Sequence, residues 1–277
     1  MGECLKRDEQ GRSKDLFTAL AYQLATQAVL AGNAEGMVWV DALSNPTLAL
    51  MKVGHRLYLA GDSRHARNGI DQLYESLFNQ LLPEAKEHGS DGYLLYYSDS
   101  GWENVLQATI FAGRTVYPGR RNYYELSLPG SMWQPPYTPV LPHGLSLKVV
   151  DEGLMEETRL VHYDALVEEM QSERESVADF MSRSFGTVIV GESAILGWCL
   201  SEYNLGERCE IGIATDEAYR RRGLATLEAI HMIRQGIEKG IRRFGWHCWL
   251  RNEGSNATAR RLGFEHINEH GSYFLPA

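Results

Sequence analysis

The stretch Thr215-Asp-Glu-Ala-Tyr-Arg-Arg-Arg-Gly-Leu-Ala225 carries the strongest structural signal in this chain. A β-type run, Cys209–Thr215, leads into it, and a helical pattern follows Gly223, with apolar residues at Leu227, Ile230, Ile233, Ile237 and Ile241. The first amides of a helix have no intrahelical acceptor, and the helix dipole favours negative charge there. Because Gly223 has no Cβ, a ligand can approach the backbone closely. The sequence therefore predicts a diphosphate-binding turn at a helix start.

The spacing of this turn differs from that of the common nucleotide-binding loops. The chain has no G-x-x-x-x-G-K-[ST] and no G-x-G-x-x-G after a strand, which disfavours nucleoside triphosphate and dinucleotide sites. Arg220-Arg-Arg-Gly-Leu-Ala225 instead resembles the [QR]-x-x-G-x-[GA] pyrophosphate loop of the GNAT superfamily of acetyl-CoA-dependent N-acetyltransferases. Taken alone, the hexamer fits a basic, solvated helix N-terminus equally well.

The residues after the loop extend the resemblance. Gly240 is expected to close the helix, and Phe244-Gly-Trp-His-Cys-Trp-Leu250 reads as the next strand. The family then has an Asn, a short helix with a small residue, and a Gly-Phe turn. Asn252-Glu-Gly-Ser-Asn-Ala-Thr-Ala-Arg-Arg-Leu-Gly-Phe264 is similar, with Ser255 expected as the helix N-cap. With two motifs at compatible spacing, the chain is identified as a member of the GNAT superfamily.

The resemblance implies an N-acetyltransferase that moves an acetyl group from acetyl-CoA to a primary amine by direct attack in a ternary complex. The loop would bind the diphosphate of coenzyme A, mostly through main-chain N–H groups, and the pantetheine arm would lie along the preceding strand. The implied cofactor-binding residues are Ile213, Ala214, Thr215, Arg220, Arg221, Arg222, Gly223, Leu224, Ala225, Thr226, Asn252 and Ser255. No metal site is expected.

The catalytic residues are less well defined by the sequence. A base must accept a proton from an amine whose pKa is about 10, and Glu210 stands where many family members have an acidic strand residue. It fits an exposed structural carboxylate equally well, and Glu202 and Tyr203 are the reserve candidates. A lone strand histidine such as His247 is more often structural.

One position departs from the family pattern. Many members have a tyrosine in the last helix that protonates the leaving thiolate, and this chain has Ala259 there. Tyr203, Tyr273 or a water molecule would then supply the proton. The missing tyrosine also keeps open an alternative, a non-catalytic acyl-CoA-binding regulatory protein with a GNAT fold.

The signature Glu210-Ile-Gly-Ile-Ala-Thr215 followed by Tyr219-Arg-Arg-Arg-Gly-Leu-Ala-Thr226 resembles a GNAT subgroup with an extended N-terminal region. That subgroup includes zwittermicin-resistance-type enzymes, which acetylate an amine-bearing antibiotic. The resemblance implies a small-molecule amine acceptor, whose identity depends on variable loops.

Composition narrows the class of partner. The net charge of −9 argues against nucleic acid and suits a cationic amine. The four cysteines lack close pairing, which favours reduced thiols and a cytoplasmic location, and no apolar run is long enough to cross a membrane. A homodimer is compatible with the sequence.

Five of the nine prolines lie between Pro129 and Pro142, which predicts a connector between two domains. The predicted ranges are an N-terminal α/β domain at 1–128, the connector at 129–144 and the GNAT domain at 145–277. The fold class is α/β (α+β), with a mixed, mainly antiparallel GNAT sheet flanked by helices in the C-terminal half.

The N-terminal domain repeats the order strand, helix, strand, helix, strand. A helix is expected from about Asp15 to Leu30, and a hairpin over Leu48–Val53 and Arg56–Ala60. The domain is either a degenerate GNAT-like repeat without the diphosphate loop or an unrelated α/β cap.

Overall fold

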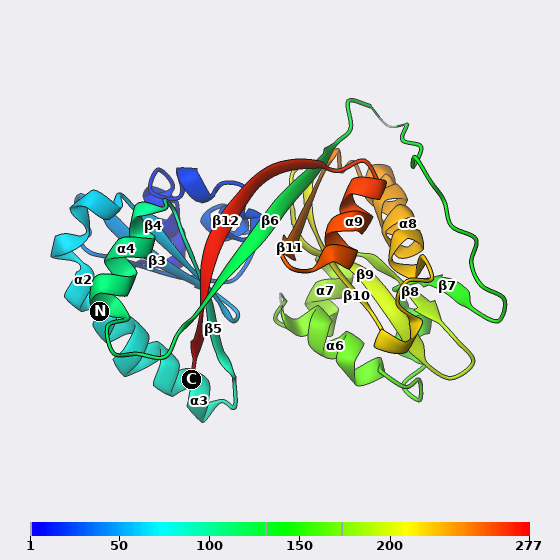
Figure 1. Cartoon of the computed structure of the whole chain (residues 1–277), viewed down its shortest axis with the longest axis horizontal. Helices are drawn as coiled ribbons and strands as arrows, with labels where there is room; N and C mark the ends of the chain where they lie inside the picture. The colour runs from blue at the N-terminus through cyan, green and yellow to red at the C-terminus, as the bar shows by residue number, and fades with distance from the viewer. Residues whose placement is uncertain (1, 131, 173) are drawn as a thin grey trace. The chain divides into compact units, whose positions relative to one another are not determined.

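The computed structural model describes residues 2–130, 132–172 and 174–277, except for the side chains of 66–68. The chain forms two compact units: unit 1 comprises Met1–Arg121 and His270–Ala277, and unit 2 comprises Asn122–Glu269. Two long strands, β6 (Tyr117–Ser127) and β12 (Glu265–Pro276), contribute residues to both units (Figure 1). The domain ranges drawn from the sequence stay a prediction. Residues 270–277 belong to unit 1 together with the N-terminal half of the chain, an arrangement that their order in the sequence does not suggest.

Unit 1 is built on a sheet with the strand order β1-β2-β3-β4-β5-β12. Its own strands are β1 (Glu3–Cys4), β2 (Met37–Val40), β3 (Leu48–Val53), β4 (Arg56–Gly61) and β5 (Gly92–Tyr97). Neighbours pair antiparallel, except that β4 and β5 are parallel. The predicted hairpin is confirmed, because Val53 pairs with Arg56 across a tight turn in which Gly54 has φ 54°.

The first helical region of unit 1 differs from the prediction. Arg7–Ser13 and Thr18–Leu20 are short 3-10 helices, and α1 covers only Leu24–Leu30. The predicted continuous helix from Asp15 to Leu30 is therefore wrong. Gln23 is extended, with ψ 96°, and the Thr26 hydroxyl donates to its carbonyl at 2.9 Å. This local side-chain bond competes with helix propagation.

The other helical segments of unit 1 follow β4 and β5. The crossover from β4 to β5 contains a 3-10 helix (Ser63–Asn68), α2 (Ile70–Tyr74), a π-helical segment (Glu75–Leu81) and α3 (Leu82–Glu87). After β5 come α4 (Gly101–Val105) and a second π-helical segment, Leu106–Ile110. Their buried leucines pack with Leu57, Leu59 and Leu95 on one face of the sheet.

Unit 2 has the strand order β12-β6-β11-β10-β9-β8-β7. Its own strands are β7 (Ser146–Val149), β8 (Gly186–Val190), β9 (Ile195–Leu205), β10 (Arg208–Thr215) and β11 (Arg243–Trp249). The pairs β7/β8, β8/β9 and β9/β10 are antiparallel and β10/β11 is parallel. This mixed, mainly antiparallel sheet confirms the predicted fold class.

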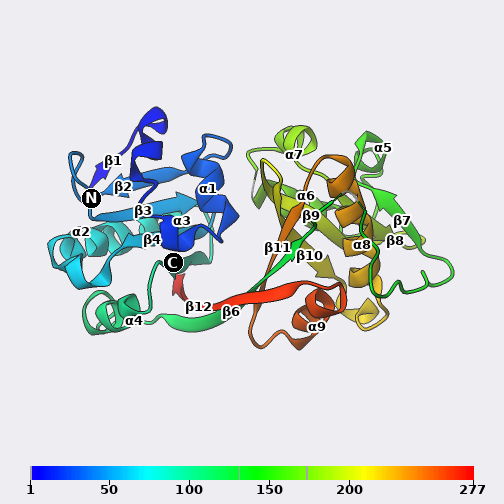
Figure 2. The same ribbon diagram turned by 90° about the horizontal axis from the view of Figure 1, so that it is seen from above.

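Helices cover both faces of the sheet in unit 2 (Figure 2). α8 (Leu224–Glu238) and α9 (Glu253–Arg261) pack on one face, where Ile230 and Ile233 meet Cys209. α6 (Tyr163–Ser172) and α7 (Val177–Arg183) pack on the other face. A short helix, α5 (Glu152–Met155), precedes them in the chain. Asp151 starts this helix by accepting a bond from the Leu154 amide at 2.9 Å.

The two units repeat one pattern of strand pairing. In each, three successive antiparallel pairs are followed by one parallel pair, β4/β5 in unit 1 and β10/β11 in unit 2, with helices in the crossover. The last strands are exchanged: β5 pairs with β12, and β6 neighbours β11. This pairing supports the internal repeat over an unrelated cap.

Candidate functional site

The turn between β10 and α8 has the backbone conformation of an anion site. Asp216 accepts a bond from the Ala218 amide at 2.8 Å and starts a 3-10 turn, Glu217–Tyr219. Arg221 and Gly223 are both left-handed, with φ 62° and 81°. The N-cap of α8 is Gly223, which has no side chain with which to accept a bond from the first amides of the helix. Left-handed residues in such a turn direct successive N–H groups into one concavity, which suits a diphosphate.

The arginine side chains of this turn are exposed and hold its own backbone. Arg220 Nε donates to the Thr215 carbonyl at 3.3 Å, and Arg222 donates to the Ala218 carbonyl at 3.2 Å. The Arg222 guanidinium also lies 4.9 Å from the centre of the Tyr219 ring. These contacts help to hold the shape of the turn.

Before the chain reaches this turn, the parallel strands β10 and β11 separate. Their parallel pairing runs from Arg208↔Arg243 to Ile211↔Trp246, whereas β10 stays paired with β9 as far as Thr215↔Gly197. A shift of register between Glu210 and Ile211 marks a bulge where the separation begins. The segment Gly212–Thr215 thus presents a strand edge beyond its last β11 pair. Such an edge can take an extended ligand as an added strand, and it contains Ile213, Ala214 and Thr215.

The second sequence motif holds α9 against β11. The Asn252 side chain accepts a bond from the Ser255 amide at 3.1 Å and is the N-cap of α9. The expectation that Ser255 caps this helix is therefore wrong. Ser255 lies inside the first turn, where its hydroxyl accepts a bond from Trp246 Nε1 at 2.9 Å. An Asn placed three residues before the free amide is the better positioned cap.

Glu210 is buried beside a histidine. Only 3% of Glu210 is exposed, which excludes the alternative of an exposed strand carboxylate. His247 Nε2 lies 3.5 Å from Glu210 Oε1, and the Tyr123 ring stacks on His247 with 4.6 Å between ring centres. Burial, with the nearby charges of Glu125 and Glu210, raises the pKa of Tyr123. The sequence analysis treated His247 as structural and did not single out Tyr123, because contacts across strands leave no local signal.

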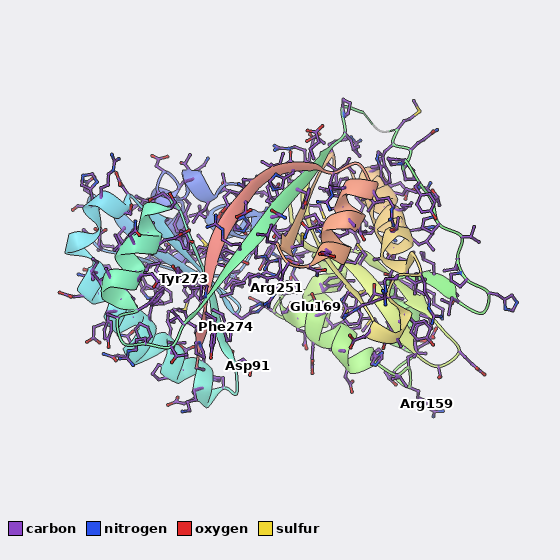
Figure 3. All side chains as sticks on the ribbon, in the orientation of Figure 1. Asp91, Arg159, Glu169, Arg251, Tyr273 and Phe274 are labelled. Atoms are coloured by element: carbon purple, nitrogen blue, oxygen red, sulfur yellow. The ribbon has the colours of Figure 1, made fainter. Side chains whose placement is uncertain are left out.

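Tyr203 and Tyr273 lie in different units. Tyr203 is fully buried and pairs directly across from Glu210 on β9, with the Arg174 guanidinium 5.8 Å from its ring centre. Tyr273 lies on β12 within unit 1 (Figure 3), where its hydroxyl accepts a bond from Gln107 at 3.1 Å. Ala259 of α9 is fully buried in the core that α8 and α9 form with the sheet. The roles of both tyrosines stay predictions.

A small pocket opens on the face of the sheet that α6 and α7 cover. Glu169 of α6 (Figure 3) and Glu202 of β9 line it together with apolar side chains: Met170, Phe180 and Leu200, and with Ser201. Glu202 also lies across Gly212, where any side chain would meet its carboxylate. The pocket therefore combines two carboxylates with an apolar wall, next to the strand that carries Glu210.

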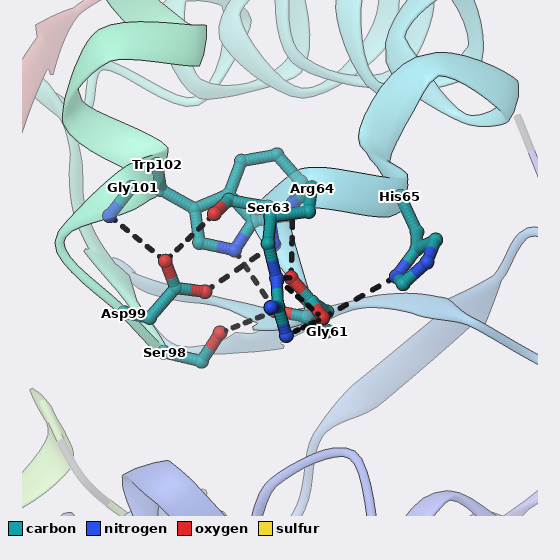
Figure 4. Close-up of polar contacts among 9 residues, drawn as sticks. Gly61, Ser63, Arg64, His65, Ser98, Asp99, Gly101 and Trp102 are labelled. Atoms are coloured by element: carbon teal, nitrogen blue, oxygen red, sulfur yellow. Dashed lines mark hydrogen bonds and ion pairs between the residues drawn. The ribbon is translucent and has the colours of Figure 1, made fainter.

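The corresponding turn in unit 1 is filled by the chain itself. The Asp99 carboxylate accepts bonds from the Ser63 amide at 3.3 Å, the Ser63 hydroxyl at 2.7 Å and the Gly101 amide at 2.8 Å (Figure 4). The Gly61 carbonyl, at the end of β4, accepts bonds from Ser98 Oγ and Trp102 Nε1. Here β4 and the segment after β5 stay joined by side chains.

Other candidate chemistries find no support in the described residues. No group of three or more His, Cys, Asp or Glu side chains in that part of the chain could hold a metal ion. Cys199 and Cys209 are buried, and burial raises the pKa of each thiol. Nor does any helix within the described ranges reach the length and apolarity needed to cross a membrane.

Comparisons with known proteins agree on one family. The family model for GNAT acetyltransferase matches residues 14–273, a range that includes most of both units. YdfB of Bacillus subtilis (strain 168), described as an uncharacterized N-acetyltransferase, is 28% identical over 251 residues, which cover 89% of this chain and 88% of that protein.

Solved structures share the fold across the whole chain. A GCN5-related N-acetyltransferase-like protein from Streptococcus suis 89/1591 superposes with a TM-score of 0.69 at 19% identity, covering 97% of this chain and 99% of that one. A tandem GNAT protein from the clavulanic acid biosynthesis pathway gives 0.58 at 14% identity, covering 99% and 98%. At these identities the likeness concerns the fold.

Proposed function

Since the chain belongs to the GNAT acetyltransferase family and is an acyltransferase, we propose that it moves an acetyl group from acetyl-CoA to a primary amine of a small molecule. One observation carries the proposal. The left-handed turn at Arg221 and Gly223 opens into α8 beside the strand edge Gly212–Thr215, so that a diphosphate cradle adjoins a slot for an extended arm.

The residues of this cradle fit coenzyme A. Amides of Gly223, Leu224 and Ala225 would hold the diphosphate, and the backbone of Ile213–Thr215 would hold the pantetheine arm. When bound, the cofactor supplies an activated acetyl thioester. Asn252 and Ser255 contribute by fixing the start of α9 next to β11, through the Ser255 amide and the Trp246 indole. The resemblance to the subgroup that includes zwittermicin-resistance-type enzymes stays a prediction.

Glu210 is the proposed general base. The acceptor enters as an ammonium ion, and its nitrogen needs a free electron pair to attack the acetyl carbonyl carbon. Glu210 takes one proton, directly or through a water molecule, and His247 at 3.5 Å stabilises the carboxylate that carries out this transfer. Tyr203 is the proposed donor of the proton that the leaving thiolate would need, and the second proton that the nitrogen loses would restore the tyrosine. Tyr273 lies in unit 1, and its role as a donor stays a prediction.

The acceptor is proposed to be cationic. Glu169 and Glu202 give the pocket two carboxylates, and its volume of about 10 Å³ has room for an ammonium group but not for a carbon skeleton. A carboxylate pair attracts an ammonium ion and holds it near Glu210 before its proton is removed. Direct attack then needs both substrates bound together.

The proposal is tested by Gly223→Ala, with Gly240→Ala as the matched control. Gly240, at the opposite end of α8, is also left-handed, with φ 88°, so both variants acquire similar backbone strain. Isothermal titration with acetyl-CoA should give one site per chain in the wild type. We expect affinity to fall more than tenfold in Gly223→Ala, because its Cβ would lie 2.9 Å from the Pro139 ring and displace the turn, and to persist in Gly240→Ala, where a Cβ meets nothing within 4 Å. A wild-type protein that binds no acetyl-CoA and acetylates no amine would sink the proposal.

A further inference from the structure

The proline-rich connector belongs structurally to the diphosphate turn. Trp133 packs against the core under α8 and α9, and Leu141 packs with Leu224 and Leu227 at the start of α8. Between these two anchors, Pro139 is buried against Gly223, where a Cβ on the glycine would lie 2.9 Å from the Pro139 ring. All of these residues belong to unit 2. The segment is therefore a fixed part of the turn's surroundings, beyond its role as a connector.

Tyr137 is the exposed member of this segment. Its side chain is 53% exposed even though the residues around it are anchored. The Arg261 guanidinium, at the end of α9, lies 5.9 Å from the centre of the Tyr137 ring. Pro136 approaches the backbone at Gly263 in the same region. An aromatic face and a cation thus stand together on the segment that touches the diphosphate turn.

Arg260, the residue before Arg261, makes a different contact. Arg260 donates to the Tyr124 hydroxyl at 3.0 Å, so it holds α9 to β6. Arg261 instead points to the connector, where its charge is available to an anion. A planar ring beside a guanidinium can stack a nucleobase and pair with a phosphate at the same time.

We propose that Tyr137 and Arg261 form the nucleotide end of the cofactor site, with Tyr137 stacking on adenine and Arg261 binding a phosphate. The inference rests on the proposed function, because it takes the diphosphate to lie on the turn at Gly223. The adenosine of coenzyme A is joined directly to that diphosphate. Tyr137 is two residues from Pro139, a span of at most about 7 Å along the chain. Its ring is therefore within reach of a group that continues from the diphosphate.

The ligands that test this separate the two ends of the cofactor. Adenosine 3′,5′-bisphosphate contains the nucleotide end alone, and acetylpantetheine contains the thioester end alone. Isothermal titration of Tyr137→Ala should show about tenfold weaker binding of acetyl-CoA and of the bisphosphate. Binding of acetylpantetheine should not change. Tyr137→Phe should bind all three ligands as the wild type does, because the ring remains.

A matched control lies in the same segment. Val140 is 88% exposed, and Val140→Ala should leave all three affinities unchanged. Arg261→Ala should weaken the bisphosphate more than adenosine, which has no phosphate. If Tyr137→Ala binds the bisphosphate as tightly as the wild type while acetyl-CoA still binds, the nucleotide subsite is overturned and the proposed function stands. A wild type that binds none of these ligands overturns both.

Discussion

The turn after β4 and the turn after β10 occupy the same place in two copies of one strand order, yet they differ in what fills them. In unit 1, the Asp99 carboxylate takes the Ser63 amide and the Gly101 amide, as an anion would. In unit 2, Gly223 precedes α8 with no capping side chain among the described residues, and exposed arginines surround it. An internal carboxylate stabilises the first turn, and we propose that an external anion takes the same place at the second.

The strands beside the two turns differ in the same way. In unit 1, Ser98 and Trp102 bond to the Gly61 carbonyl and join the end of β4 to the chain beyond β5. In unit 2, the pairing of β10 with β11 ends at Ile211, and a strand edge follows. A single fold thus yields a closed turn and an open one, and the difference lies in a few side chains rather than in topology.

The largest expected effect tests the strand residue that precedes each turn. Glu210 and Tyr58 hold equivalent places, since each is the third residue of its parallel register. Glu210→Gln should lower kcat by about 10²–10⁴-fold, because the base is lost, with little change in acetyl-CoA affinity. Tyr58→Phe should leave kcat unchanged. Steady-state kinetics with any accepted amine measures both, and equal activity of Glu210→Gln and wild type would contradict the assignment of Glu210.

A smaller effect is expected at the closed turn. Asp99→Ala removes an acceptor from two amides and a hydroxyl, which should lower the free energy of unfolding by about 2 kcal/mol. Thermal unfolding measures this loss, and acetyl-CoA affinity should not change. Asp62→Ala is the control: Asp62 pairs with Arg64 at 2.6 Å at the surface, where an ion pair contributes little. Equal losses in the two variants would show that the Asp99 bonds do not stabilise the turn.

The smallest effect is a pH dependence confined to unit 1. Burial, with Arg121 and Arg120 nearby, lowers the pKa of His270 from 6.5 to about 3. The unfolded chain therefore binds a proton below pH 6.5 that the folded chain refuses. The contribution of the uncharged His270 to the free energy of unfolding is fully present above pH 6.5. It is lost as the pH falls towards 3, by about 1 kcal/mol per pH unit.

The variant His270→Gln should reduce this slope, because glutamine does not titrate. A glutamine at 270 can still meet Gln23, which lies 3.2 Å from His270 Nε2, so the packing is kept. Urea unfolding at pH 7, 6 and 5 measures it. The groups that face His270 are Tyr22, Tyr96, Arg121 and Arg120, and the two tyrosines are uncharged over this range. An identical pH slope in the variant would assign the effect to carboxylates elsewhere.

Local chemistry explains which features the sequence could predict. Gly223 and Gly240 mark the two ends of α8, because left-handed residues at helix ends leave a signal within a few residues. Gly240 and Ile241 donate to Ile237 and Gly236, the pattern expected at a helix that ends in glycine. The hairpin at Gly54 and the helix–Gly–Phe order at Gly263 and Phe264 are confirmed on the same basis.

Failures of prediction trace to side chains that bond across or along the chain. The predicted helix breaks at Gln23, which is extended and whose carbonyl accepts a bond from the Thr26 hydroxyl. Asn252 replaces Ser255 as a cap because its side chain reaches the amide three residues ahead. His247 carries no local signal of its partner, and only the pairing of β11 beside β10 brings it to Glu210. In these cases several local arrangements fit the same residues, and tertiary packing selects one.

By itself, the sequence determined the glycine turn before α8, the helices and strands around it, and the family to which they belong. These features depend on backbone conformations and periodicities that span a few residues. Only the tertiary structure decided that β6 and β12 are exchanged, that β10 separates from β11, and that Pro139 lies on Gly223. Each of these joins residues far apart in the chain, where contacts form only after the strands have chosen their partners, and no short-range pattern records that choice.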